Sequence, residues 1–91
     1  MTIEQIKTAN ANAGHHFFDR DTLRFFRSRV SSRTYVGRDG RIYFVTSEQN
    51  GFFGTRRYSV RATVDGVSID TVPEFQAFAN ARTAHAFAAN Q

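Results

Sequence analysis

Residues 14–30, "GHHFFDRDTLRFFRSRV", place two Phe-Phe pairs beside four arginines. Guanidinium groups bind phosphate or carboxylate groups through two parallel hydrogen bonds, and they also stack on rings. Aromatic side chains stack on unpaired bases. This chemistry predicts a surface that binds nucleic acid or an acidic partner. The alternative is an amphipathic segment whose rings are buried and whose arginines are solvated.

The arginines are concentrated in one part of the chain. Residues 19–61 hold ten arginines against four acidic residues, whereas residues 62–91 hold one arginine against three acidic residues. Tyrosines alternate with the arginines in the segments that resemble strands, which is the general pattern of single-strand binding. Codon bias and a solvated basic face over buried tyrosines are the alternatives. The predicted nucleic-acid or partner-binding residues are Arg24, Arg27, Arg29, Arg33, Arg41, Arg56, Arg57, Tyr35, Tyr43, Phe52 and Phe53.

The segment "NGFFGT" is predicted to be a loop that carries an aromatic anchor. Gly51 and Gly54 flank Phe52 and Phe53, and two arginines follow. Aromatic residues surrounded by arginine are typical of binding hot spots. We expect one of the two rings to project toward a partner. The alternative is that both rings fold back over the open end of the sheet.

Catalytic chemistry is not expected. His15 and His16 are adjacent, His85 is distant, and none has a metal-ligand spacing with the carboxylates. A metal or proton-transfer site at His15 with Asp19 or Asp21 is a weak alternative. The chain also contains no phosphate loop, nucleophile elbow, zinc signature or cysteine. We therefore predict no enzyme activity, cofactor, metal or small-molecule substrate. The N-terminus lacks the pattern of a signal peptide, and no apolar run is long enough for a membrane span, so we expect a cytoplasmic location.

Two helices are expected before the strands. Thr2 and Gln5 have the spacing of a capping box, and the apolar periodicity predicts a helix over residues 3–13. A second helix is expected from Thr22, with Asp21 as its N-cap. Its period places Leu23, Phe26 and Val30 on one side and leaves Phe25 near the arginines. We expect Phe25 to pack against the first helix or beneath the next strand.

Two Asp-Gly dipeptides predict two β-hairpins. With Asp39-Gly40 as a two-residue turn, Val36 pairs with Tyr43 and Tyr35 pairs with Phe44. The strand over residues 42–46 is apolar on both faces, as a central strand covered on both sides would be.

The second turn, Asp65-Gly66, predicts that Ala62 pairs with Ile69 on a buried face. It also pairs Val64 with Val67 and Val60 with Thr71, and it places an Arg61–Asp70 ion pair on the polar face.

The C-terminal segment is expected to be helical. Thr71, Pro73 and Glu74 have the pattern of a helix start, and alanines follow. A break near Asn80, with Thr83 capping a separate helix that contains Phe87, is the alternative. Together these elements predict one small α+β domain over residues 1–91: an N-terminal helix, a short second helix, a four-stranded antiparallel meander and a C-terminal helical segment packed on the sheet.

The stretches "ANANAGHHFFDRDTLRFFRSRV", "YFVTSEQ" and "RRYSVRA" resemble a family of small uncharacterised proteins encoded by phages and other mobile elements. The resemblance covers most of the chain, and its most distinctive part is Thr-x-Arg-Phe-Phe-x-Ser-Arg. It implies a non-enzymatic accessory protein. Binding to nucleic acid is the first functional expectation. Binding to a host or phage protein, as an inhibitor of a nucleic-acid-processing or defence complex, is the second.

Overall fold

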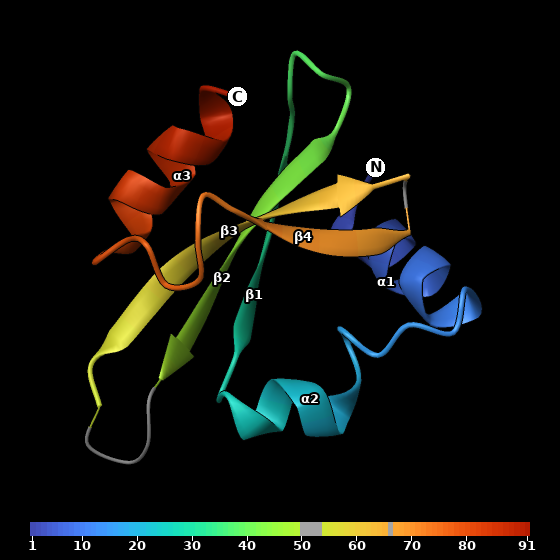
Figure 1. Ribbon diagram of the computed structural model, residues 1–91, viewed down its shortest axis with the longest axis horizontal. Coiled ribbons are helices and arrows are strands. Elements are labelled where there is room, and N and C mark those ends of the chain that lie inside the picture. Colours follow the sequence, from blue (N-terminus) through green and yellow to red (C-terminus); the bar gives the residue numbers. More distant parts are fainter. Residues whose placement is uncertain (50–53, 66) are drawn as a thin grey trace.

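The chain folds into an α+β structure with the expected order of elements (Figure 1). The computed structural model describes residues 1–49, 54–65 and 67–91. The predicted architecture is confirmed: four antiparallel strands form a meander in the order β1-β2-β3-β4, and the C-terminal helix packs on the sheet. The elements are α1 (Ile3–Asn12), α2 (Arg20–Phe25), β1 (Arg29–Val36), β2 (Ile42–Gln49), β3 (Arg56–Val64), β4 (Ser68–Val72) and α3 (Ala81–Ala89).

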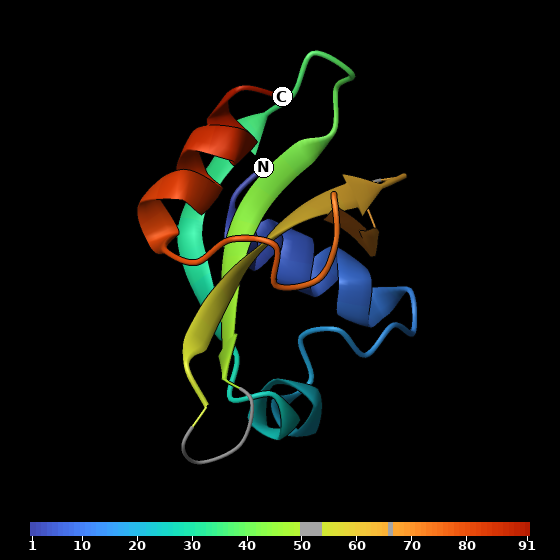
Figure 2. The same cartoon turned by 60° about the vertical axis from the view of Figure 1, so that its left-hand side comes forward.

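Both faces of the sheet are covered, by different helices (Figure 2). On one face, Ala84 and Ala88 of α3 pack on Tyr43, Val45 and other residues of β2 and β3. On the other face, α1 contributes two isoleucines to a cluster around Phe44. Since β2 alternates between these two clusters, it is buried along nearly its whole length. This confirms the expectation of a central strand covered on both sides.

The start of α1 is stabilised by the predicted capping box. The Gln5 amide donates to Thr2 Oγ1 (3.2 Å), and the Thr2 amide donates to Gln5 Oε1 (2.8 Å). Ile3 and Ile6 are buried, and Asn10 continues the same face. The amphipathic spacing in the sequence therefore identified the packed face correctly.

The second helix begins earlier and ends sooner than predicted. Asp19, rather than Asp21, is the N-cap residue of α2, and Arg27 adopts a left-handed backbone conformation (φ 50°) directly after the helix. Because α2 ends at Phe25, Val30 does not extend its apolar side and lies in β1 instead. The expectation that Phe25 packs inside was wrong, because its side chain is 79% exposed.

Both hairpin registers differ from the prediction by one residue. In the first hairpin, Val36 pairs with Ile42 and Tyr35 pairs with Tyr43. The reason is a longer connection, in which the Gly40 amide donates to the Gly37 carbonyl (3.0 Å) and the Gly37 amide donates to the Arg41 carbonyl (2.8 Å). The two-residue Asp39-Gly40 turn was therefore wrong.

In the second hairpin, the Val67 amide donates to the Val64 carbonyl (3.2 Å), so Val67 belongs to the turn. Val64 then pairs with Ser68 rather than with Val67. The other three predicted pairs shift in the same way: Thr63 pairs with Ile69, Val60 with Val72, and Arg61 with Thr71 rather than with Asp70. Ile69 accordingly packs on the α1 face.

The C-terminal helix is shorter than the first expectation. Residues 73–79 are not helical, because Phe78 exchanges two backbone hydrogen bonds with Tyr58 (2.8 and 3.0 Å) at the side of β3. The helix begins after Asn80, whose Oδ1 accepts from the Thr83 amide (2.9 Å). The alternative is therefore right in placing a separate helix that contains Phe87 after Asn80, but the segment before it is not helical and Asn80, rather than Thr83, is the cap.

Candidate functional site: a basic hollow and an aromatic pocket

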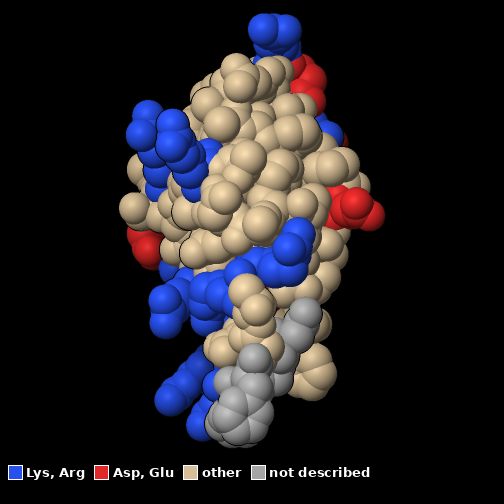
Figure 3. Space-filling model, turned by 90° about the vertical axis from the view of Figure 1, so that its left-hand side faces the viewer, with Lys and Arg blue, Asp and Glu red and all other residues tan. Residues whose placement is uncertain are grey.

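Four arginines meet at the end of the sheet where α2 lies, which is the lower end in Figure 1. Arg24 lies in α2 and Arg27 follows that helix. Arg29 and Arg56 are the first residues of β1 and β3. We call this site the basic hollow; its volume is about 390 Å³, and the described residues that line it are Leu23, Arg24, Arg27, Ser28, Arg29, Gln49 and Arg56. None of these is acidic. Figure 3 shows basic side chains at several places on one face, including a group in its lower half.

The backbone around α2 holds the basic hollow in shape. The Gln49 amide at the end of β2 donates to the Phe26 carbonyl (3.0 Å), and the Ser28 amide donates to the Leu23 carbonyl (2.7 Å). Arg56 Nη1 donates to Ser47 Oγ (2.9 Å) and to the Ser47 carbonyl (3.1 Å), so its position is fixed on β2. Among the described residues, the guanidinium groups of Arg24 and Arg29 form no salt bridge and are exposed. These two side chains are therefore available to an anion.

A second, mainly apolar cavity lies on the α1 face of the sheet, beside α2. We call it the aromatic pocket; its volume is about 400 Å³, and it is lined by Phe17, Thr22, Leu23, Phe26, Ser28, Thr46, Glu48, Arg61 and Phe75. Leu23 and Ser28 also line the basic hollow, so the two sites share a wall. The Phe26 and Phe75 rings are 40% and 44% exposed and form an edge-to-face pair with centroids 5.7 Å apart.

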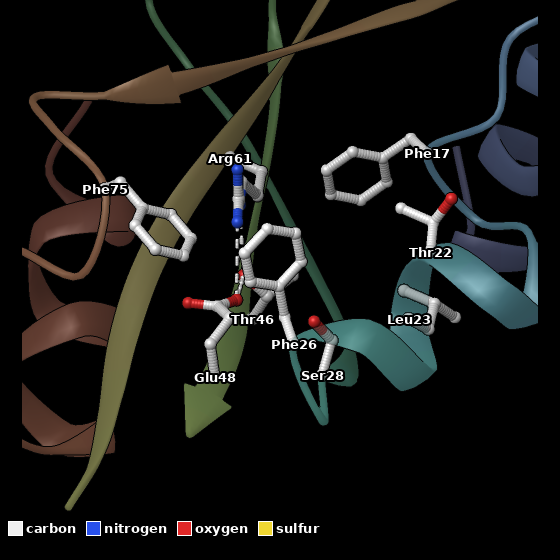
Figure 4. A pocket seen from close by; sticks show the side chains of 9 residues that line it. All are labelled: Phe17, Thr22, Leu23, Phe26, Ser28, Thr46, Glu48, Arg61 and Phe75. Carbon is white, nitrogen blue, oxygen red and sulfur yellow. Dashed lines mark hydrogen bonds and ion pairs between the residues drawn. The ribbon is translucent and has the colours of Figure 1, made fainter. Parts of the chain in front are cut away.

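A buried ion pair lies inside the aromatic pocket (Figure 4). Arg61 Nη2 donates to Glu48 Oε2 (3.3 Å), and Ser59 Oγ donates to Glu48 Oε1 (2.7 Å). The two side chains are 11% and 1% exposed. Burial lowers the pKa of the Arg61 guanidinium, and the neighbouring Glu48 carboxylate opposes that shift.

The Arg61 guanidinium is also held between two rings (Figure 4). Its central carbon lies 5.1 Å from the centroid of Phe17 and 5.3 Å from that of Phe75. At these distances the cation is attracted by both π systems. Two hydroxyls complete its surroundings, because Nε donates to Thr46 Oγ1 (3.0 Å) and Nη1 donates to Thr71 Oγ1 (2.6 Å). The predicted Arg61–Asp70 ion pair was therefore wrong, and Asp70 instead contacts Arg41 (3.3 Å).

Of the predicted binding residues that the structure describes, four line the basic hollow: Arg24, Arg27, Arg29 and Arg56. Arg57 Nε donates to the Gln76 carbonyl (2.9 Å), so this side chain supports the segment before α3. Arg41 lies at the opposite end of β2 and donates to the Thr63 carbonyl (3.2 Å). Phe52 and Phe53, and with them the predicted loop anchor, lie outside the described residues.

The two predicted tyrosines both contact other side chains of the protein, and they differ in burial. Tyr43 is buried and donates to Asp39 Oδ2 (2.8 Å). Burial raises the pKa of the Tyr43 phenol, and the hydrogen bond to Asp39 adds to this effect. The Tyr35 hydroxyl lies 2.8 Å from His85 Nδ1, and the Arg33 guanidinium lies over the Tyr35 ring (5.2 Å). Tyr43 is therefore not available for stacking on a ligand, and Tyr35 is only half-buried.

The residues of the aromatic pocket were largely missed in the sequence. Phe26 was expected to point inward, but the contribution of Phe75 depends on the irregular segment after β4, which the sequence predicted to be helical. Glu48 could have indicated this pocket from the sequence, because it is the one acidic residue of β2, a strand that is buried on both faces.

His16 Nδ1 lies 2.6 Å from Asp19 Oδ2 in an exposed pair. Among residues 1–49, 54–65 and 67–91, no three His, Cys, Asp or Glu side chains group as metal ligands would. Within the same residues, no helix is long and apolar enough to cross a membrane.

The fold and the two adjoining sites define a small α+β domain with a basic, partly aromatic surface at one end of its sheet. Residues 2–89 match the model of a family described as "Family of unknown function (DUF7447)", and the chain belongs to this family. Neither the curated proteins nor the solved structures contain a match to the chain.

Proposed function

We propose that this protein binds nucleic acid and that the basic hollow holds the sugar-phosphate backbone. The observation that carries the proposal is the convergence of Arg24, Arg27, Arg29 and Arg56, from separate segments, on one hollow whose described lining includes no carboxylate. Arginine forks match the geometry of phosphate oxygens and are weakly hydrated, so they bind phosphate at a small desolvation cost. The overall charge of +4 further favours a polyanionic partner.

A salt titration tests this proposal. Fluorescence anisotropy of labelled single- and double-stranded DNA and RNA should report binding at low salt that weakens steeply as salt is added. Each phosphate contact contributes about 0.7 to 0.9 to the slope of log K against log salt, so four arginines predict a slope of roughly −3. The absence of binding to all four probes at low salt would contradict the proposal.

Binding to a host or phage protein, as an inhibitor of a nucleic-acid-processing or defence complex, is the second candidate. The observation that favours it is an exposed aromatic patch, in which the 79% exposed Phe25 packs on Phe26 and Phe26 packs on Phe75, since exposed apolar patches mark protein contacts. The resemblance to proteins of phages and other mobile elements agrees with such a partner. Partner binding that tolerates high salt, without binding to nucleic acid, would favour this candidate over the first.

A further inference from the structure

The aromatic pocket is open to a ligand and offers two kinds of contact. The exposed edges and faces of Phe26 and Phe75 provide apolar surface. Thr22 and Ser28 add hydroxyl-bearing side chains to the lining, and Ser28 lies at the wall shared with the basic hollow. A volume of about 400 Å³ lies within the usual range of small-ligand sites, about 300 to 1,000 Å³. A planar, mostly apolar group with polar edges fits these features.

The location of the aromatic pocket beside the basic hollow indicates which class of ligand fits it. It shares Leu23 and Ser28 with the basic hollow, so a ligand that fills both must carry negative charge directly beside a planar ring. We infer that the aromatic pocket receives an unpaired base of a nucleic acid whose backbone lies in the basic hollow. This inference rests on the proposed function and extends it from binding of phosphate to preference for single strands.

The buried ion pair gives the aromatic pocket a fixed shape. Arg61 is held by Glu48 and by the Phe17 and Phe75 rings, so these two rings cannot collapse toward each other without displacing a buried cation. A rigid, already open pocket binds at a lower entropic cost than one that must open. A base in a duplex cannot enter it without unpairing, which is why single strands are favoured.

The test compares probes of equal length and equal phosphate number: a single-stranded DNA oligonucleotide, and an oligonucleotide in which every base is replaced by an abasic analogue. Base stacking on protein rings predicts that the wild-type protein binds the oligonucleotide roughly fivefold to a hundredfold more tightly than the abasic probe. Phe26→Leu and Phe75→Leu should remove most of this difference and leave affinity for the abasic probe unchanged. Both side chains are partly exposed, and leucine retains apolar volume.

Val36→Ala is the control, because Val36 is an exposed apolar residue at the opposite end of β1 and lines neither site. It should bind both probes as the wild type does. Equal wild-type affinity for the two probes would overturn the inference while leaving the proposed function intact, whereas failure to bind either probe would overturn both. If N-acetyl-phenylalanine amide, and not the oligonucleotide, shifts the NMR signals of the Phe26 and Phe75 rings, the occupant is a protein side chain and the inference is wrong.

Discussion

Glu48 and Arg61 show how one side-chain pair supports both the core and the aromatic pocket. The carboxylate is 1% exposed, and its described partners are the guanidinium and two hydroxyls. Removing one member of a buried ion pair leaves an uncompensated charge, which costs more than the pair itself contributes. The pair therefore positions the neighbouring Phe17 and Phe75 rings, and losing either member should destabilise the protein.

Glu48→Gln should lower the free energy of unfolding by about 3 to 5 kcal/mol, because Arg61 then stays buried without a counter-charge. Asp70→Asn is the matched control, since Asp70 forms a partly exposed pair with Arg41. That change should cost no more than about 1 kcal/mol. Urea unfolding of both variants measures the difference, and equal losses would contradict this account.

His85 should make stability depend on pH. Burial, with a smaller contribution from the Arg33 charge, lowers the pKa of His85 below its usual value of 6.5. In the window just below pH 6.5 the unfolded chain therefore binds more protons than the native state, and stability falls as the pH falls. Below the lowered native pKa the loss is complete.

Thermal melts of the wild type and of His85→Gln between pH 5 and 8 measure this effect. Glutamine keeps an acceptor for the Tyr35 hydroxyl, and the other two histidines are present in both proteins. The difference between the two melting temperatures should change below about pH 6.5, the ordinary pKa of histidine. A difference that stays constant across this range would show that His85 does not titrate as described.

At the scale of elements, α3 is positioned by its small residues. Ala84 and Ala88 are fully buried against β2 and β3, so the helix backbone lies close to the sheet. Any larger side chain at these positions must push the helix outward. Ala86, on the opposite side of the same helix, is exposed.

Ala84→Leu should therefore destabilise the protein by about 1 to 3 kcal/mol through overpacking. Ala86→Leu should change stability by no more than about 0.5 kcal/mol, because it adds volume where solvent lies. Chemical denaturation of the two variants provides the comparison. If Ala84→Leu is as stable as Ala86→Leu, the close packing of α3 is not as described.

The elements were predictable from the sequence, but their exact pairing was not. Apolar periodicity and the Thr2–Gln5 capping box identified α1, and the Asp-Gly dipeptides identified both hairpins. The turn length depends on whether Gly37 and Val67 join the turn, which local sequence does not determine. A shift of one residue moves Ile69 to the other face of the sheet and moves Arg61 from Asp70 to Thr71.

At the scale of the whole molecule, four of the predicted arginines come together because the chain brings the end of α2 to the starts of β1 and β3. Arginine enrichment alone predicted a broader surface. Arg41, Arg57 and Tyr43 lie outside the basic hollow, and their side chains bond to the protein's own backbone or carboxylates. Whether an arginine can bind a ligand depends on its neighbours in the folded protein, and the composition does not reveal those neighbours.

The most direct test of the central claim is a charge-matched comparison of two double variants. Arg24→Gln/Arg29→Gln removes two positive charges from the basic hollow, whereas Arg38→Gln/Arg82→Gln removes two exposed charges outside it. In anisotropy titrations with single-stranded DNA at several salt concentrations, the first variant should bind more weakly. Its log-log salt slope should be smaller by about 1.4, the single-strand value for two lost phosphate contacts, and the second variant should match the wild type closely. Equal effects of the two variants would contradict the account, because binding would then follow net charge rather than the basic hollow.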